Sequence, residues 1–299
     1  MAFRTVIITN PARLHARKEQ LEVHQEDVYR VPLDDIVVLL LESPDVVFSS
    51  ACLSKLADRG IAVITCDNKF MPCAYLSSNL PHSRQTKMAQ KQFGMSQPLK
   101  KRIWQRIIQA KIDNQADCLA FYEIDGSDQL HQYASQVNSG DTSNRESLAA
   151  RYYFPRLFLG HSRSDENVIN DALNYSYSIV RSIISRSIVA HGLYPPLGIH
   201  HKNEFNNYNL SDDLIEPFRP IIDLFVRTYP PRLEYLSTED RHAYVNLAHL
   251  ICWIDDKHMS ISSAAELMTS SFVEVLNTND FRKLTLPSVD GVTLKESIK

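Results

Sequence analysis

Hydrophobic and polar positions in the first part of the chain follow the spacing of β-strands rather than that of helices. Apolar runs or alternations with this spacing lie at residues 5–9, 21–23, 36–41 and 61–65. One short helix is expected from about Ser50 to Leu56, ending at Gly60, because glycine readily takes the left-handed conformation that closes a helix. The pattern predicts a β-rich N-terminal domain over residues 1–80, a sheet or sandwich with one short helix.

Beyond a polar segment at residues 77–97, hydrophobic positions recur at helical spacing. Leu99, Ile103 and Ile107 mark one face of a helix for which Ser96 is the expected N-cap. Later helical patterns cover approximately residues 165–191, 212–228, 238–254 and 260–276. We therefore predict an α+β fold in which residues 81–299 form a larger, all-helical domain.

Length and composition exclude several classes of protein. The chain has 299 residues, of which 44% are apolar, enough for two domains with hydrophobic cores. Its eight glycines are dispersed and form no phosphate-cradling loop, so nucleotide-fuelled and nicotinamide chemistry are not expected. The longest apolar run, residues 36–41, is far shorter than the roughly 20 residues of a membrane-spanning helix, and no signal-peptide pattern opens the chain. We expect a soluble, cytoplasmic protein with no membrane partner.

Charge is nearly balanced overall but unevenly distributed. The 32 basic and 35 acidic residues give a net charge of −3, yet no acidic residue lies between Asp67 and Asp113. The basic residues of this acid-free segment are Lys69, Arg84, Lys87, Lys91, Lys100, Lys101, Arg102, Arg106 and Lys111. Such a segment is either a solvated helix face or a surface that meets a polyanion.

Side chains able to bind a metal ion gather at three places in the second part of the chain. They are Glu146, the histidine pair His200 and His201, and the acidic cluster of Asp212, Asp213 and Glu216. Glu146 follows Ser143 by three residues, the spacing of a capping box, and spacing alone favours that structural role. Histidines in a polar loop are more often surface residues than ligands, and acids in the first turn of a helix are favoured by its dipole.

The same residues also suit a hard divalent cation, which two carboxylates and one imidazole can hold. Asp213 and Glu216 are three residues apart, so a helix would present both carboxylates on one face. No G-x-S-x-G, H-E-x-x-H or His-Asp motif points to a competing class of hydrolase. The residues alone permit metal-dependent phosphodiester chemistry without singling it out.

Three strings of residues resemble the motifs of one known family. SNRESLAARYYF at residues 143–154 is similar to the first catalytic motif of the CRISPR-associated integrase and endonuclease family of spacer acquisition. LGIHHKNEFN at residues 197–206 and NLSDDLIEPFRP at residues 209–220 resemble its histidine and acidic motifs, in the form typical of type II systems. EPFRP is the most specific string, and similarity at residues 31–36 and 166–175 extends the resemblance over nearly the whole chain.

The resemblance implies a metal site made of Glu146, His201 and Glu216, which are also the implied catalytic residues, with Mg²⁺ or Mn²⁺ as the cofactor. His201 is the implied ligand rather than His200, because it precedes the asparagine and phenylalanine of the loop as the family's ligand does. Asp213 occupies a position that is often acidic in the family and is a candidate to assist the site. For Glu146 the resemblance outweighs the capping-box interpretation.

The activity that the resemblance implies is the insertion of short foreign DNA segments into a CRISPR array, in which a 3′-hydroxyl attacks a phosphodiester at the edge of a repeat. The helical domain would then be catalytic, and the acid-free segment becomes the expected DNA-contact surface. Two alternatives remain open. One is a metal-dependent nuclease of branched DNA, and the other is a non-catalytic DNA-binding scaffold whose carboxylates only cap helices.

The resemblance also implies a set of partners. Double-stranded DNA is expected, both as the incoming segment and as the CRISPR repeat. A homodimer joined through the N-terminal domain is expected to bind a small dimeric CRISPR-associated protein in the integration complex. Type II systems add the effector nuclease and a ring-forming accessory protein.

Overall fold

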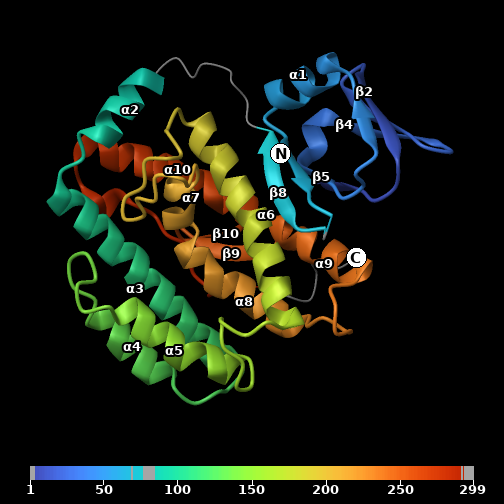
Figure 1. The fold of residues 1–299 in the computed structure, drawn as a ribbon. Helices are drawn as coiled ribbons and strands as arrows, with labels where there is room; N and C mark the ends of the chain where they lie inside the picture. The colour runs from blue at the N-terminus through green and yellow to red at the C-terminus, as the bar shows by residue number, and fades with distance from the viewer. Residues whose placement is uncertain (1–3, 69, 77–84, 291, 293–299) are drawn as a thin grey trace.

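The fold is that of a computed structural model in which residues 4–68, 70–76, 85–290 and 292 are described. Two four-stranded sheets and one helix make up the N-terminal part, and helices make up most of the remainder (Figure 1). The predicted α+β fold class is confirmed. In Figure 1 the N-terminal part lies on one side of the long helix α6 (Val168–Ala190), and α3 (Gln97–Phe121) lies on the other. None of the described helices is long and apolar enough to cross a membrane.

The first sheet is an antiparallel meander extended by one parallel strand. In spatial order its strands are β4 (Val28–Pro32), β3 (Gln20–His24), β2 (Ala12–Arg17) and β6 (Val46–Phe48). Lys18 and Glu19 form the turn between β2 and β3, and both have the positive φ that the tightest hairpins require. Leu14 and Leu21 turn inward and form a small core with α1 (Ser50–Asp58), the short helix that the sequence predicts.

The second sheet joins the N-terminal part to the helices. In spatial order its strands are β1 (Arg4–Ile8), β5 (Ile36–Leu41), β7 (Ala62–Cys66) and β8 (Pro72–Leu76). The first three strands are parallel, and all six residues of β5 are buried, as expected of a strand covered on both faces. Leu39 and Leu41 of β5 belong to the small core, whereas Val38 and Leu40 point the other way into the main core with the helices. The second sheet therefore contributes to the small core of the N-terminal part on one face and to the main core with the helices on the other.

The expected domain boundary at residue 80 lies among residues 77–84, outside the described residues, and stays a prediction. Within the polar segment, residues 85–93 form α2 (Gln85–Phe93), which hydrophobic spacing did not predict. The other helices named below are α4 (Ser127–Ser135), α5 (Arg145–Leu157), α7 (Asn209–Leu214), α8 (Arg219–Thr228), α9 (Thr238–Val245) and α10 (Ile261–Thr278). α6 is central, because it packs against β7 and β8 and also against α8, α9 and α10.

The predicted continuous helix over residues 212–228 is interrupted. α7 ends, and a short 3₁₀ turn (Glu216–Phe218) leads into α8. Pro217 lacks the N–H that would continue the helical hydrogen-bond ladder, and its ring crowds the preceding turn. The interruption places Glu216 at the junction of two helices, although the backbone stays right-handed helical through Ile215.

The C-terminal part is not all-helical, contrary to the prediction. The expected helix over residues 238–254 is helical only in its first part, after which β9 (Ile251–Ile254) pairs antiparallel with β10 (Lys257–Ser260). Asp255 and Asp256 have φ values of 52° and 55°, a left-handed conformation that aspartate tolerates and that a two-residue hairpin needs. The turn residues, rather than the hydrophobic spacing, carry the signal for this hairpin.

Candidate metal centre

Glu146 lies in the first turn of α5, and its carboxylate extends toward α3 instead of capping its own helix. The backbone N–H groups of Arg145 and Glu146 donate to the two carboxylate oxygens of Asp141, at 2.8 and 3.0 Å. Because Asp141 already satisfies donors at this helix end, the capping-box interpretation with Ser143 is wrong. The Glu146 side chain, which is 29% exposed, instead reaches Lys111 of α3.

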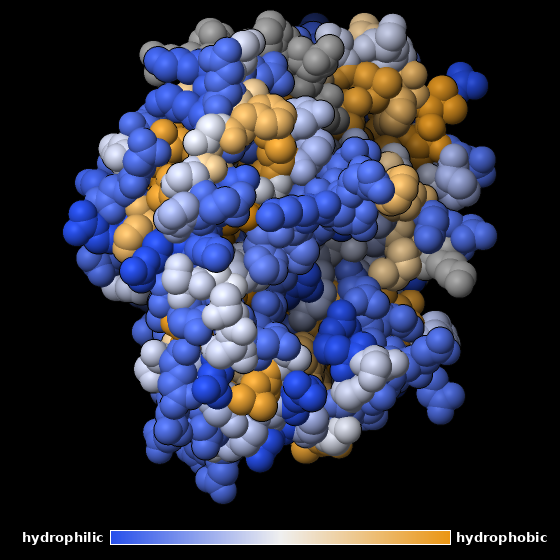
Figure 2. Space-filling model, turned by 60° about the vertical axis from the view of Figure 1, so that its left-hand side comes forward, coloured by the Kyte–Doolittle hydropathy of each residue, from blue (hydrophilic) through white to orange (hydrophobic). Residues whose placement is uncertain are grey.

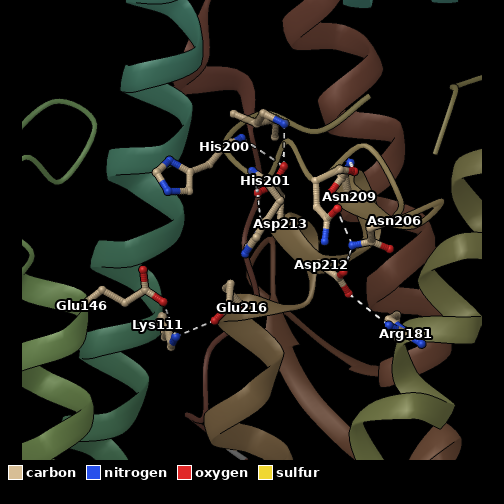
Figure 3. Close-up of polar contacts among 12 residues, drawn as sticks. Lys111, Glu146, Arg181, His200, His201, Asn206, Asn209, Asp212, Asp213 and Glu216 are labelled. Carbon is tan, nitrogen blue, oxygen red and sulfur yellow. Dashed lines mark hydrogen bonds and ion pairs between the residues drawn. The ribbon is translucent and has the colours of Figure 1, made fainter. Parts of the chain in front are cut away.

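Lys111 connects the two glutamates. Its Nζ lies 2.7 Å from Glu146 Oε1 and 2.5 Å from Glu216 Oε2 (Figure 3). The side chains of Lys111 and Glu216 are only 10% and 6% exposed, so water screens their attraction weakly. Burial by itself would lower the pKa of Lys111, but Glu216 and Glu146 outweigh burial and raise it. The ammonium therefore stays charged between the two carboxylates.

Glu216 is also bound by Arg219, whose Nε donates to Glu216 Oε1 at 2.9 Å. Burial opposes ionisation of the Glu216 carboxyl, but the charges of Arg219 and Lys111 outweigh it and lower the pKa of Glu216 to about 2. Glu216 Oε2 has its ion-pair contact with Lys111 but accepts no hydrogen bond of good angle from the described residues. A buried, ionised oxygen thus retains capacity to bind a further group.

His201 lies in the loop between α6 and α7 and is oriented by Asp213. Its Nδ1 is 2.8 Å from Asp213 Oδ1, and the same carboxylate accepts the backbone N–H groups of Ile199, His200 and His201 at 2.5, 3.1 and 3.1 Å. Asp213 is fully buried, so it ties this loop to α7. The hydrogen bond with Asp213 raises the pKa of His201, against the opposing effect of burial. With Nδ1 held, Nε2 is the nitrogen left to bind a ligand.

His200 and Asp212, which adjoin His201 and Asp213 in the sequence, have other contacts. The imidazole of His200 stacks on Trp104, with ring centres 4.2 Å apart and planes 3° from parallel. Asp212 turns toward α6, where it lies 3.5 Å from Arg181 Nη1, and it accepts a hydrogen bond at 2.6 Å from Nδ2 of Asn206 in the loop before α7 (Figure 3). Both side chains therefore have structural partners other than the two glutamates.

The three predicted ligands come from α5, the loop before α7 and the junction before α8. Figure 3 shows Glu146 and Glu216 on either side of Lys111, with His201 on the loop above them. After the larger effect of Asp213, the charge of Glu216 also raises the pKa of His201, so these two groups lie within electrostatic reach. Two carboxylates and an imidazole suit Mg²⁺ or Mn²⁺, and the incompletely bonded Glu216 Oε2 adds to the fit.

The described residues do not yet form a closed coordination shell. Among them, no three histidine, cysteine, aspartate or glutamate side chains lie close enough together to hold one metal ion. The space between two of the predicted ligands is taken by the ammonium of Lys111 instead. The assignment of Glu146, His201 and Glu216 as metal ligands and catalytic residues stays a prediction.

Lys111 is the residue of this site that sequence reasoning missed, because its charge placed it with the expected DNA-contact surface. The spacing of Lys111 along the helix nevertheless indicates that this lysine is buried. It follows Ile103 and Ile107 at intervals of four residues, which puts a lysine on the buried face of α3. A charged residue on an apolar stripe is almost never fully buried unless it is paired, so this spacing predicts an acidic partner.

The rest of the acid-free segment supplies a partly exposed basic surface. Lys87 of α2 and Lys101 and Arg102 of α3 are exposed, and Lys100 is partly exposed. Lys69 and Arg84 lie outside the described residues. The face that carries α2 and α3 is mainly hydrophilic and is hollowed near its middle (Figure 2).

The sequence matches the family model described as CRISPR associated protein Cas1 over residues 5–235. It is also 36% identical over 305 residues to the CRISPR-associated endonuclease Cas1 of Neisseria meningitidis serogroup C (strain 8013), with 99% of each chain covered. The chain therefore belongs to the Cas1 family of CRISPR-associated proteins, as its motifs predict. This membership supports a role as a CRISPR nuclease or integrase.

Solved structures share the fold at low sequence identity. A casposase bound to integration product has a TM-score of 0.74 and 17% identity, covering 94% of this chain and 92% of that chain. A Cas6-RT-Cas1–Cas2 complex has a TM-score of 0.71 and 15% identity, covering 96% of this chain and 36% of that chain. At these identities the likeness concerns the fold alone.

Proposed function

We propose that this protein is a metal-dependent DNA integrase that inserts short foreign DNA segments into a CRISPR array by 3′-hydroxyl transesterification. The observation that carries the proposal is the position of Glu146 and Glu216 on either side of the Lys111 ammonium. The imidazole of His201 lies nearby, and its Nδ1 is held by Asp213. Membership of the Cas1 family and likeness to the fold of a casposase bound to integration product support the same class of reaction.

Each residue of the proposed site has a distinct task. Glu146, Glu216 and Nε2 of His201 would hold the ion, and Asp213 keeps the His201 ring in the orientation that exposes Nε2. The pKa of about 2 keeps Glu216 ionised at physiological pH, so protons do not compete for its oxygens. When bound, Mg²⁺ or Mn²⁺ supplies Lewis-acid activation of the phosphoryl oxygen and of the attacking hydroxyl.

The proposed reaction exchanges one phosphodiester bond for another. The 3′-oxygen of the incoming strand bonds to phosphorus, the bond from phosphorus to the 3′-oxygen of the repeat strand breaks, and the proton of the attacking hydroxyl ends on the leaving oxygen. The number of phosphodiester bonds is unchanged, so no nucleotide cofactor and no covalent enzyme intermediate is required. The basic surface on α2 and α3 would bind the DNA backbone with strong dependence on salt.

We propose partners on the same basis. The protein would bind double-stranded DNA, form a homodimer through its N-terminal part, and assemble with a small dimeric Cas2-type protein. A Cas1–Cas2 complex among the structures with this fold supports that assembly. The type II form of the motifs adds the effector nuclease and a ring-forming accessory protein as further proposed partners, and a cytoplasmic location stays a prediction.

A nuclease of branched DNA is the second candidate function. It would use the same three ligands with water or a hydroxyl of the branched product as the nucleophile, and the Neisseria relative is named an endonuclease. The third alternative, a scaffold whose carboxylates only cap helices, loses its basis at Glu146, which does not cap α5.

Strand transfer of a labelled duplex with free 3′-hydroxyl ends into a plasmid carrying a cognate repeat would test the proposal. The assay includes the small partner and compares no metal, Mg²⁺ and Mn²⁺ for the wild type, Glu216→Gln and the control Glu204→Gln, an exposed residue of the His201 loop. We expect metal-dependent joined product that falls at least about 100-fold in Glu216→Gln and not in Glu204→Gln. Nicking without joined label would favour the nuclease, and DNA binding without either product would favour the scaffold.

A further inference from the structure

Lys111 occupies an unusual place for a helix lysine. It is the only cation that contacts both glutamates in the part of the chain that the structure describes, and its side chain is 10% exposed. Placing the partly exposed Glu146 carboxylate beside the buried Glu216 carboxylate is costly unless positive charge accompanies them. The ammonium therefore stabilises the pair of glutamates in the protein without metal.

The position of Lys111 between Glu146 and Glu216 also hinders the binding of a metal ion. A divalent cation that binds Glu146 Oε1 and Glu216 Oε2 needs the space that Lys111 Nζ takes up between these two oxygens. Two cations between the same pair of carboxylates would repel each other at close range in a medium that screens charge weakly. The ammonium must therefore move away when an ion enters.

The structure also places a further hydrogen-bond acceptor, Gln115 Oε1, on the same face of α3 as Lys111. A cavity of about 180 Å³ adjoins this site, and its charged lining includes two arginines as well as two carboxylates. It is lined by Lys111, Gln115, Phe154, Arg163, Tyr177, Glu216, Arg219 and Asp223. Gln115 follows Lys111 by four residues on α3, so both side chains lie on the same helix face. The Gln115 side chain is buried, and its Oε1 accepts no hydrogen bond from the described residues. A buried carbonyl oxygen without a donor is energetically unfavourable, so Gln115 Oε1 would gain from accepting a hydrogen bond.

We propose that Lys111 is a resident cation of this site, which bridges Glu146 and Glu216 when no metal is bound and moves to Gln115 Oε1 when a divalent ion takes its place. The proposal rests on the proposed metal-binding function of the two glutamates. Lys111 then acts as a positioning residue that keeps the ligands together in the empty state and sets the metal affinity, because the ion has to displace it.

Binding of Mn²⁺ to Lys111→Gln and Lys111→Met would test the competition. Calorimetric titration gives the dissociation constant, and the unfolding temperature is measured with and without Mn²⁺. We expect both variants to bind Mn²⁺ at least about tenfold more tightly than the wild type, to unfold at lower temperature without metal, and to gain more from Mn²⁺. Lys101→Met, which removes an exposed lysine of the same helix, is the matched control and should leave all three quantities unchanged. Lys111→Gln keeps a polar group between the carboxylates in case Lys111→Met does not fold.

A double-mutant cycle with Gln115→Leu tests the second position. If Gln115 receives the displaced ammonium, Gln115→Leu weakens Mn²⁺ binding of the wild type about three- to tenfold but has no effect in the Lys111→Gln background. Equal effects in both backgrounds would overturn this part of the proposal, because Gln115 would then act without the lysine.

The outcomes separate the inference from the proposed function. If the wild type binds Mn²⁺ and Glu216→Gln does not, but both Lys111 variants bind it no more tightly than the wild type, the metal site stands and the resident-cation proposal is overturned. Weaker binding in the Lys111 variants would overturn it as well, since the lysine would then support the ion. If the wild type binds no Mn²⁺ at all, the metal site itself fails, and the proposed function fails with it.

Discussion

Replacement of Asp213 by asparagine tests whether this buried carboxylate, rather than the metal ligands alone, builds the site. In the wild type its two oxygens accept three backbone N–H groups and the Nδ1–H of His201. Asparagine keeps the size of the side chain but removes its charge and exchanges one accepting oxygen for an NH₂ group. Each orientation of the amide then places donors opposite donors in a fully buried position.

The magnitude follows from these four contacts. A hydrogen bond to a charged group contributes about 1.5–3 kcal/mol, and one between neutral groups contributes about 0.5–1.5 kcal/mol. Loss of charge thus costs roughly 1 kcal/mol for each contact, or about 4 kcal/mol for Asp213→Asn in total. That is a large share of the roughly 5–15 kcal/mol that separates most folded domains from their unfolded states.

Urea unfolding and Mn²⁺ titration of Asp213→Asn would measure the two consequences. We expect the free energy of unfolding to fall by about 4 kcal/mol and Mn²⁺ affinity to fall about 10- to 100-fold, because His201 loses the group that orients its ring. Asp212→Asn is the matched control, since among the described residues the adjacent carboxylate contacts Asn206 and Arg181. It should cost less than about 1 kcal/mol and leave the affinity unchanged.

Two results would refute this reasoning. A loss of stability in Asp213→Asn no greater than that in Asp212→Asn would mean that the backbone bonds of the loop do not depend on the carboxylate charge. Unchanged Mn²⁺ affinity together with the expected loss of stability would mean that Asp213 supports the fold but does not position His201.

Three further predictions concern stability. Gly198→Ala should lower the unfolding temperature and weaken Mn²⁺ binding, because a Cβ at this position would overlap the carbonyl oxygen of His201. Arg241→Met should lower the free energy of urea unfolding by about 3–5 kcal/mol, because it leaves Glu42, whose side chain is 1% exposed, without its ion-pair partner. Burial raises the pKa of Asp223 to about 6 in the folded protein, above its ordinary value of 3.8. The folded state therefore retains a proton that the unfolded chain releases, so stability should fall by up to about 3 kcal/mol as pH rises from about 4 to 6, and Asp223→Asn should remove this fall.

Each of these predictions has its own contrary outcome. An unchanged unfolding temperature in Gly198→Ala would show that the loop can move aside without cost. A loss below about 1 kcal/mol in Arg241→Met would show that Glu42 finds another donor or takes up a proton. The same dependence of stability on pH in the wild type and Asp223→Asn would assign the titration to another group.

Much of the fold could be predicted because its signals are local. Ser96 caps α3 through its own hydroxyl, and Gly60 takes φ +61° just after α1, so these helix ends need no distant partner. The uniformly apolar run at residues 36–41 predicts a strand, and β5 forms there as a buried inner strand of its sheet. The hairpin of β9 and β10 was misread because Asp255 and Asp256, rather than any hydrophobic spacing, determine it.

The sequence by itself determined which residues are candidates for chemistry, because a motif is defined by the order of residues and can be recognised without the fold. Only the tertiary structure decided their roles. Asp141 accepts the first N–H groups of α5, Asp213 holds the His201 loop, and Lys111 of the basic segment lies between the two glutamates. The reason is physical: caps and turns depend on neighbours in the chain, whereas the pairing of buried charges depends on which distant groups packing removes from water together.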